Sequence, residues 1–175
     1  MELVEVDVMR LGLDRSSNSY VVILQEKDGS RLLPIWIGQP EAESIVIEMN
    51  RIKRERPLTH DLCKNLIVGM GGTLRRVHIT KVQNRTFFAE LHVAVPTGMV
   101  QIDARPSDSI AIALRFAAPI YAQESLLTAM LVDDAEGDEA EFPIAQPEDE
   151  PDASAESLKQ YLENLRPEDF GKFNM

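Results

Sequence analysis

The chain has 175 residues, of which 44% are apolar, and this size and composition suit one globular domain with or without a tail. One cysteine excludes an internal disulfide. No apolar run approaches the roughly 20 residues that a membrane-spanning helix needs, and the acidic, alternating N-terminus is not a signal peptide. We therefore expect a soluble, cytoplasmic protein with a reduced Cys63 and no membrane partner.

The net charge of −11 is unevenly distributed along the chain. Residues 1–132 contain 15 acidic and 15 basic residues, whereas residues 133–175 contain 14 acidic and three basic residues. Between Arg51 and Arg85, nine basic residues stand against two acidic ones. This stretch is equally typical of an anion-binding surface and of a solvated charged face.

The first 37 residues predict three strands. Residues 3–8 alternate, and residues 19–24 and 31–37 are apolar runs separated by an Asp28-Gly29 turn signal. Pro34 has no backbone N–H to donate, so the third strand is expected near a sheet edge or at a bulge.

Two helices are expected next, over residues 39–55 and 59–70. The first has Pro40 in its first turn, and its basic residues would occupy the last turn. The second has Thr59 as a candidate N-cap, and Gly69, Gly71 and Gly72 end it with a C-cap and turn. The residues predicted to face the core are Ala42, Ile45, Val46, Met49 and Ile52 in the first helix and Leu62, Leu66 and Ile67 in the second.

The next segments predict an antiparallel pair, a short strand and a third main helix. Residues 73–83 and 86–95 both alternate, residues 99–104 form a sixth strand, and the helix from Pro106 ends before Pro119. A short strand over 119–122 and a helix over 124–130 complete the series. The predicted fold class is α+β, with a mixed, largely antiparallel sheet and helices packed against it.

Composition changes after Val132. Residues 133–154 are acidic and contain proline, which predicts a linker, and residues 155–175 contain a short amphipathic helix with Leu158, Tyr161, Leu162 and Leu165. The predicted organisation is a domain over 1–132, this linker, and a C-terminal helix with a tail.

The chain has no Walker loop, GxGxxG, HExxH or GxSxG motif, and one cysteine excludes a CxxC zinc site. Carboxylates, arginines and histidines remain as candidates. Acidic clusters suit hard cations such as Mg²⁺ or Mn²⁺, which assist phosphodiester cleavage. Taken singly, each acid is also explained by helix capping. The candidate metal ligands are Glu41, Asp61, Asp103 and Asp108.

The three histidines differ in their surroundings. His60, between Thr59 and Asp61 and beside the basic stretch, is the best candidate for general acid–base catalysis. His78 and His92 fall on adjacent predicted strands, where histidines are usually partly exposed. Cys63 is expected to be a small core residue.

The segment "DARPSDSIAIALRF" over residues 103–116 contains more charge than a helix cap needs. Ser107 or Asp108 can accept hydrogen bonds from the free N–H groups of the helix start. A cap requires one acceptor, yet Arg105 lies beside both Asp103 and Asp108. The surplus predicts that this helix end forms one wall of a site.

The blocks "LPIWIGQPEAESI", "RPLTHDL" and "IDARPSDSIAIALRFAAPIY" resemble the bifunctional nuclease family over roughly residues 1–132. The resemblance implies an α+β fold and a nuclease acting on DNA and RNA. The matching positions are Gly38, Glu41, Ala42, Arg56, Pro57, His60, Asp61, Asp103, Arg105, Pro106, Ser107 and Asp108.

Two functions follow from these patterns. The first is a metal-assisted nuclease, in which His60, Asp61, Asp103 and Asp108 are catalytic. Its candidate substrate-binding residues are Arg56, Arg105, Ser107, Arg75 and Arg76. The alternative is a non-catalytic module that binds nucleic acid or protein and is screened by its acidic tail. A homo-oligomer is expected in either case.

Overall fold

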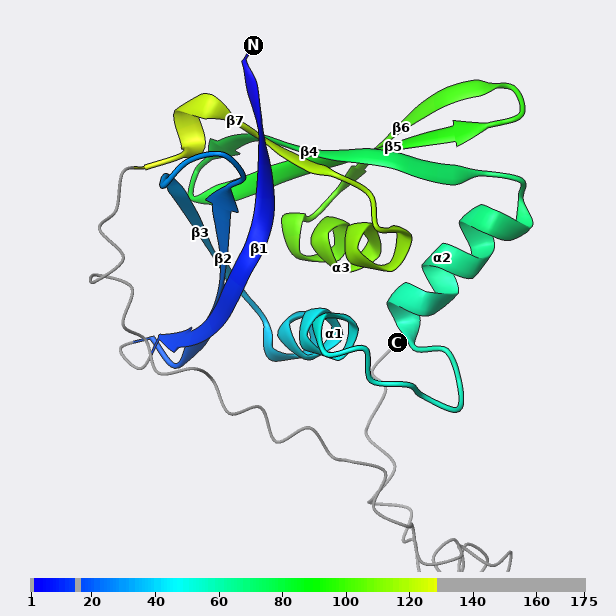
Figure 1. Ribbon diagram of the computed structural model, residues 1–175, viewed down its shortest axis with the longest axis horizontal. Coiled ribbons are helices and arrows are strands. Elements are labelled where there is room, and N and C mark those ends of the chain that lie inside the picture. Colours follow the sequence, from blue (N-terminus) through cyan, green and yellow to red (C-terminus); the bar gives the residue numbers. More distant parts are fainter. Residues whose placement is uncertain (1, 15–16, 129–175) are drawn as a thin grey trace, which may run out of the picture. The chain divides into compact units, whose positions relative to one another are not determined.

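The computed structural model describes residues 2–14 and 17–128, and these form one mixed sheet with helices packed against it (Figure 1). The sheet order is β3-β2-β1-β7-β4-β5-β6, and among these pairs β4 and β7 alone run parallel. The predicted α+β class is confirmed. The strands are β1 (Leu3–Asp14), β2 (Ser19–Glu26), β3 (Leu32–Ile37), β4 (Thr73–Gln83), β5 (Thr86–Val95), β6 (Gly98–Ala104) and β7 (Ile120–Gln123). The helices are α1 (Gln39–Met49), α2 (Thr59–Gly69), α3 (Pro106–Phe116) and a 3₁₀ turn (Glu124–Leu126).

The N-terminal strands confirm the predicted turn and edge. The chain turns between β2 and β3 at Asp28-Gly29, where the Gly29 N–H donates to Glu26 O. Strand β3, which contains Pro34, is at one end of the sheet order, so the missing N–H disrupts no interior ladder. Strand β1 continues to Asp14, past a register shift between Val8 and Arg10.

The core lies between one face of the sheet and the helices. Val77 and Ile79 of β4 are fully buried, and α3 packs on β4 and β5 at this face. Helix α1 packs on β2, and both α1 and α2 contact α3 (Figure 1). Because side chains alternate along a strand, His78, which lies between Val77 and Ile79, points to the opposite face. That face carries a separate polar cluster, described below.

Helix α1 is shorter than predicted. It ends at Met49, with Asn50 as C-cap, and Arg51 follows with a positive φ of 53°. The basic residues therefore lie in the loop before α2, and their predicted place in the last turn of the helix is wrong. Met49, predicted to face the core, is 39% exposed.

Helix α2 begins with a different cap from the one predicted. Leu58 is the N-cap, and its N–H donates to Asp61 Oδ2 at 2.9 Å, so Thr59 is the first helical residue. Leu62 and Leu66 are 51% and 54% exposed, which contradicts their predicted core positions. After the helix, Gly71 adopts a φ of +75°, a conformation that favours glycine, as the predicted turn requires.

The end of the described chain is less helical than predicted. The turn over Glu124–Leu126 is followed by Leu127, which is buried, and by Thr128, which pairs with Leu32. Within the described ranges no helix is long and apolar enough to cross a bilayer. The predicted linker over 133–154 and helix over 155–175 lie outside the described residues, as does the boundary at 132.

Candidate active site

The starts of the three helices surround a cavity of about 580 Å³. Its wall combines the first two turns of α1, the residues that lead into α2, and the N-terminal end of α3. The lining residues are Pro40, Glu41, Glu43, Ser44, Ile47, Pro57, Leu58, Thr59, His60, Arg105 and Asp108. The three sequence blocks that predicted a site therefore contribute residues to the same cavity.

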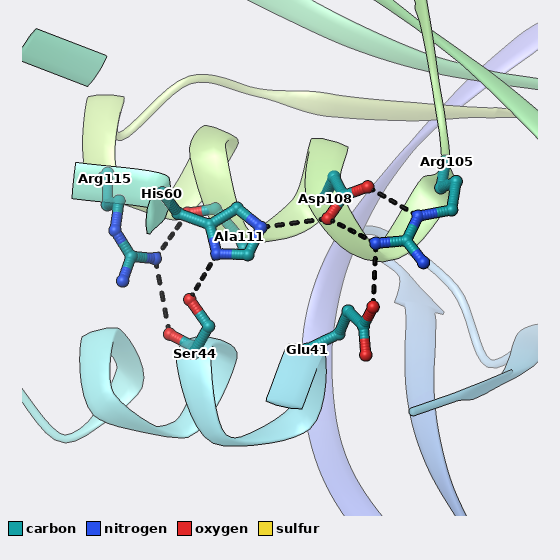
Figure 2. A network of polar contacts seen from close by, with 7 residues as sticks. All are labelled: Glu41, Ser44, His60, Arg105, Asp108, Ala111 and Arg115. Carbon is teal, nitrogen blue, oxygen red and sulfur yellow. Dashed lines mark hydrogen bonds and ion pairs between the residues drawn. The ribbon is translucent and has the colours of Figure 1, made fainter. Parts of the chain in front are cut away.

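His60 connects two of the helices through its ring (Figure 2). Its Nδ1 lies 2.7 Å from Ser44 Oγ on α1, and its Nε2 lies 3.0 Å from Asp108 Oδ1 on α3. The imidazole side chain is 12% exposed, so it borders the cavity with most of its surface enclosed. Two polar partners fix the ring plane, because each imidazole nitrogen forms one hydrogen bond.

Arg105 bridges two carboxylates at the mouth of the cavity (Figure 2). Its Nε donates to Asp108 Oδ2 at 2.7 Å and its Nη2 to Asp108 Oδ1 at 3.1 Å. The same Nη2 lies 2.7 Å from Glu41 Oε1. Arg105 is the N-cap of α3 and precedes Pro106, which favours the extended backbone seen there (φ −70°, ψ 145°). This backbone allows the guanidinium to reach the residue three positions ahead.

Asp108 does not cap its helix, contrary to the capping interpretation of the sequence. The start of α3 has no side-chain cap hydrogen bond, and the Asp108 oxygens are directed to Arg105 and His60 instead. Burial raises the pKa of Asp108, but hydrogen bonds from Arg105 and His60 outweigh it and hold the pKa below its usual value. Asp108 is therefore an anion near neutral pH.

The ionised state of Asp108 assigns the tautomer of His60. A carboxylate accepts hydrogen bonds and has none to donate, so Nε2 of His60 carries the proton that faces Asp108. In the neutral ring, Nδ1 is then unprotonated and accepts from the Ser44 hydroxyl. A hydroxyl, a base and a carboxylate that orients the base are thus arranged in series, as in activated nucleophiles.

Asp61 lies outside the cavity lining. Its Oδ1 is 2.5 Å from Arg115 Nε. Figure 2 shows that Arg115 also donates to the backbone oxygens of Ser44 and Ala111. The Arg115 side chain is 2% exposed, so Asp61 neutralises a buried cation. Burial raises the pKa of Asp61, but the bonds from Arg115 and the Leu58 N–H prevail and lower it. These contacts tie α1, α2 and α3 together behind the site.

The other predicted site residues are placed elsewhere in the fold. Asp103 is exposed on β6, and Ser107 is buried in α3 away from the cavity lining. Arg56 lies exposed in the loop before α2, outside that lining. Arg75 and Arg76 are exposed on β4. Of the predicted site residues, the structure brings Glu41, His60, Arg105 and Asp108 together.

Two of the four predicted metal ligands, Glu41 and Asp108, lie on either side of Arg105. Glu41 and Asp108 share a cation, the Arg105 guanidinium, whereas Asp61 and Asp103 lie apart from them. Carboxylate oxygens suit Mg²⁺ or Mn²⁺, and the guanidinium occupies the position that a cation bound by both side chains would take. Glu41 and Asp108 thus fit a divalent ion, provided that the exposed Arg105 side chain turns outward.

Ser44 is the site residue that the sequence reasoning missed. It is 6% exposed, and its backbone and hydroxyl both participate in the network. A single serine inside a helix gives no signal by itself. The spacing from Glu41 is a signal, however, because residues three apart lie on the same face of a helix.

Comparison with known protein families identifies the family of the chain. The model of the bifunctional nuclease domain matches residues 22–134, a range that contains every residue of the cavity lining. The chain belongs to the bifunctional nuclease domain family.

Relatives show how far the likeness extends. An uncharacterized protein of Mycobacterium tuberculosis is 39% identical over 168 residues, covering 95% of this chain and 97% of its own. Bifunctional nuclease 2 of Arabidopsis thaliana is 31% identical over 109 residues, covering 60% of this chain and 33% of the plant protein. Bifunctional nuclease 1 of Oryza sativa subsp. japonica is 29% identical over 114 residues, 63% of this chain and 34% of its own. The likeness to the plant proteins therefore concerns about a third of their length.

Proposed function

We propose that this protein is a nuclease that hydrolyses phosphodiester bonds of DNA or RNA in the cavity between α1, α2 and α3. The observation that carries the proposal is the position of His60, held between Ser44 Oγ and the ionised Asp108 at the cavity wall. Membership of the bifunctional nuclease domain family and the plant relatives named nucleases support the same reaction class.

His60 moves the proton in this proposal. Its unprotonated Nδ1 accepts the proton of the Ser44 hydroxyl while Asp108 stabilises the imidazolium that forms. Ser44 Oγ attacks phosphorus, and the departing sugar oxygen takes the proton back from His60. Water then attacks the phosphorus of the resulting phosphoserine diester while His60 accepts its proton. The bond between phosphorus and Ser44 Oγ breaks, and His60 returns the proton to Oγ, which restores Ser44 and the neutral ring.

Arg105 is the residue that binds the phosphate. Its side chain is 65% exposed at the cavity mouth, and a guanidinium pairs well with phosphate oxygens. The lining carries three carboxylates, Glu41, Glu43 and Asp108, against this one arginine. A divalent cation held by Glu41 and Asp108 would supply the further positive charge that a phosphodiester requires.

A cleavage assay with the full chain tests this function. Single-stranded and double-stranded DNA and RNA are incubated with the protein in a series of Mg²⁺ and Mn²⁺ concentrations, beside Asp108→Ala and the control Glu55→Gln in the exposed loop. We expect cleavage by the wild type and by Glu55→Gln, and its loss in Asp108→Ala. Equal cleavage by Asp108→Ala would contradict the site. Binding without cleavage by the wild type would favour a non-catalytic nucleic-acid-binding module.

A further inference from the structure

A second cluster of polar side chains lies on the face of the sheet that points away from the helices. His78 on β4 is directly opposite Glu90 on β5, and His92 follows Glu90 by two residues, so all three share that face. One donor atom from each of the three lies within 4.8 Å of the other two. The sequence predicted partly exposed histidines here; His78 is half-buried, but His92 is 4% exposed.

The buried ring of His92 has a nitrogen, Nε2, with no hydrogen-bond partner among the described residues. Glu90 Oε2 lies 3.6 Å from this nitrogen, too far for a hydrogen bond. The His78 and His92 rings are packed with their centroids 4.1 Å apart. Burying an unpaired imidazole nitrogen is unfavourable, so a nitrogen directed into a cluster of donors indicates a missing ligand.

Both rings have a lone pair available for a metal ion. Burial is the main cause that lowers the pKa of His78, to about 4, with smaller effects from His92 and Arg76. Burial and Arg76 also lower the pKa of His92, against the opposing effect of Glu90. Neutral imidazole is the form that coordinates metals.

The charges around the cluster are compatible with a cation. Glu90 contributes one negative charge, and Asp103 lies directly opposite Glu90 on β6, on the same face. Arg76 pairs with His92 in the register and adds a positive charge, but its side chain is exposed and free to extend into solvent. The carboxylates of Glu90 and Asp103 therefore offset the positive charge of Arg76.

We propose that His78, Glu90 and His92 form a binding site for a divalent transition-metal ion of the zinc class. Two imidazoles and one carboxylate with an open position are a donor set used for zinc and related ions, whereas Mg²⁺ prefers oxygen ligands alone. Tetrahedral bonds of about 2.0–2.2 Å place donors roughly 3.4 Å apart, so the side chains close by about an ångström on binding. A water molecule completes the coordination. The site is on the opposite face of the sheet from the nuclease cavity and does not depend on the proposed function.

Metal titration of the full-length protein, after removal of metals with a chelator, tests this site. Zn²⁺ binding is measured by calorimetry, and Co²⁺ is followed by its visible absorption, which reports low-symmetry nitrogen and oxygen coordination. The site variants are His78→Asn and Glu90→Gln, both at partly exposed positions. The matched control is Glu55→Gln in the exposed loop before α2, an acidic position outside both the cluster and the cavity lining. Circular dichroism checks that each variant is folded.

With Mg²⁺ in excess to fill the carboxylate site of the cavity, we expect one equivalent of Zn²⁺ in the wild type and in Glu55→Gln, and affinity at least roughly tenfold weaker in each site variant. Mg²⁺ in excess should not displace the zinc. The proposal is overturned if the wild type binds no Zn²⁺, if His78→Asn and Glu90→Gln bind it as tightly as the wild type, or if Glu55→Gln weakens binding as much as they do.

Discussion

His60 Nε2 lies 3.0 Å from Asp108 Oδ1, although 48 residues separate the two in the chain. This contact joins the start of α2 to the start of α3 and determines which ring nitrogen of His60 faces Ser44. The Asp108 carboxylate is central to the site, because it also orients the Arg105 guanidinium.

Replacing the carboxylate of Asp108 with an amide tests its role in orienting His60. Asp108→Asn retains the shape but removes the negative charge that stabilises the imidazolium, so we expect kcat to fall by roughly 10²–10⁴-fold. Single-turnover cleavage of a labelled oligonucleotide measures the effect. A kcat within twofold of the wild-type value would show that the pair is structural.

The hydroxyl of Ser44 is the proposed nucleophile. We expect Ser44→Ala to lose cleavage, while Ser109→Ala, a matched control at another buried serine, retains it. Ser109 is fully buried outside the cavity lining, and its Oγ has no hydrogen-bond partner in the described part of the chain. Mass spectrometry of quenched wild-type reactions should show a phosphorylated peptide that contains Ser44. Full activity of Ser44→Ala would instead make water the nucleophile.

The guanidinium of Arg105 is expected to bind the phosphate of the substrate. Arg105→Ala should raise KM by about tenfold or more, because a charged hydrogen bond to phosphate is lost. Arg105→Lys retains the charge without the forked geometry and should recover part of that loss. Initial rates over a range of substrate concentrations separate KM from kcat. An unchanged KM in Arg105→Ala would remove Arg105 from substrate binding.

Asp61 should matter for stability more than for chemistry. Asp61→Asn leaves the buried Arg115 cation without its partner, and the free energy of unfolding should fall by about 1–3 kcal/mol, since the carboxylate itself is partly exposed. Urea denaturation at pH 7 measures the loss. The cleavage rate of the folded variant should stay within a few-fold of the wild-type rate; loss of cleavage with unchanged stability would restore the catalytic role predicted from the sequence.

The same ion pair gives a pH dependence with a definite sign. The pKa of Asp61 is lower in the folded protein than its ordinary value of 3.8, so the unfolded chain binds more protons below that pH. The stability due to Asp61 is therefore present above pH 3.8 and is lost as the pH falls through the folded pKa. The difference in unfolding free energy between wild type and Asp61→Asn should shrink between pH 6 and pH 3. A difference independent of pH would contradict the ion pair.

Local patterns in the sequence predicted most of the fold. The Asp28-Gly29 turn, the edge strand with Pro34 and the helix after Pro106 each depend on backbone preferences of neighbouring residues, which a sequence displays directly. The predicted inward face of α2 was wrong because Leu62 and Leu66 satisfy the helical spacing, yet within the described residues no sheet or helix covers them. Periodicity reports a common face, but tertiary packing decides whether that face is buried.

The site was predictable to the extent that its residues occur in charged motifs. His60, Arg105 and Asp108 stand in such motifs and meet in the cavity. Asp103 is close to them in sequence, yet the alternation of β6 and the paired strand β5 place it opposite Glu90. Ser44 lies in α1 with no motif of its own, and its contact with His60 forms only when the loop after α1 brings His60 back against it. Such long-range contacts have no local signature.

The role of His60 as the catalytic base is tested by the cleavage of nucleic acid by a His60 variant. The full-length wild type, His60→Asn and the loop control Glu55→Gln are compared under single-turnover conditions at the divalent metal concentration that gives the highest wild-type rate. We expect His60→Asn to stay folded and to lose at least about 10²-fold in cleavage rate, while Glu55→Gln cleaves as the wild type does. A folded His60→Asn variant that cleaves at the wild-type rate would contradict this role of His60.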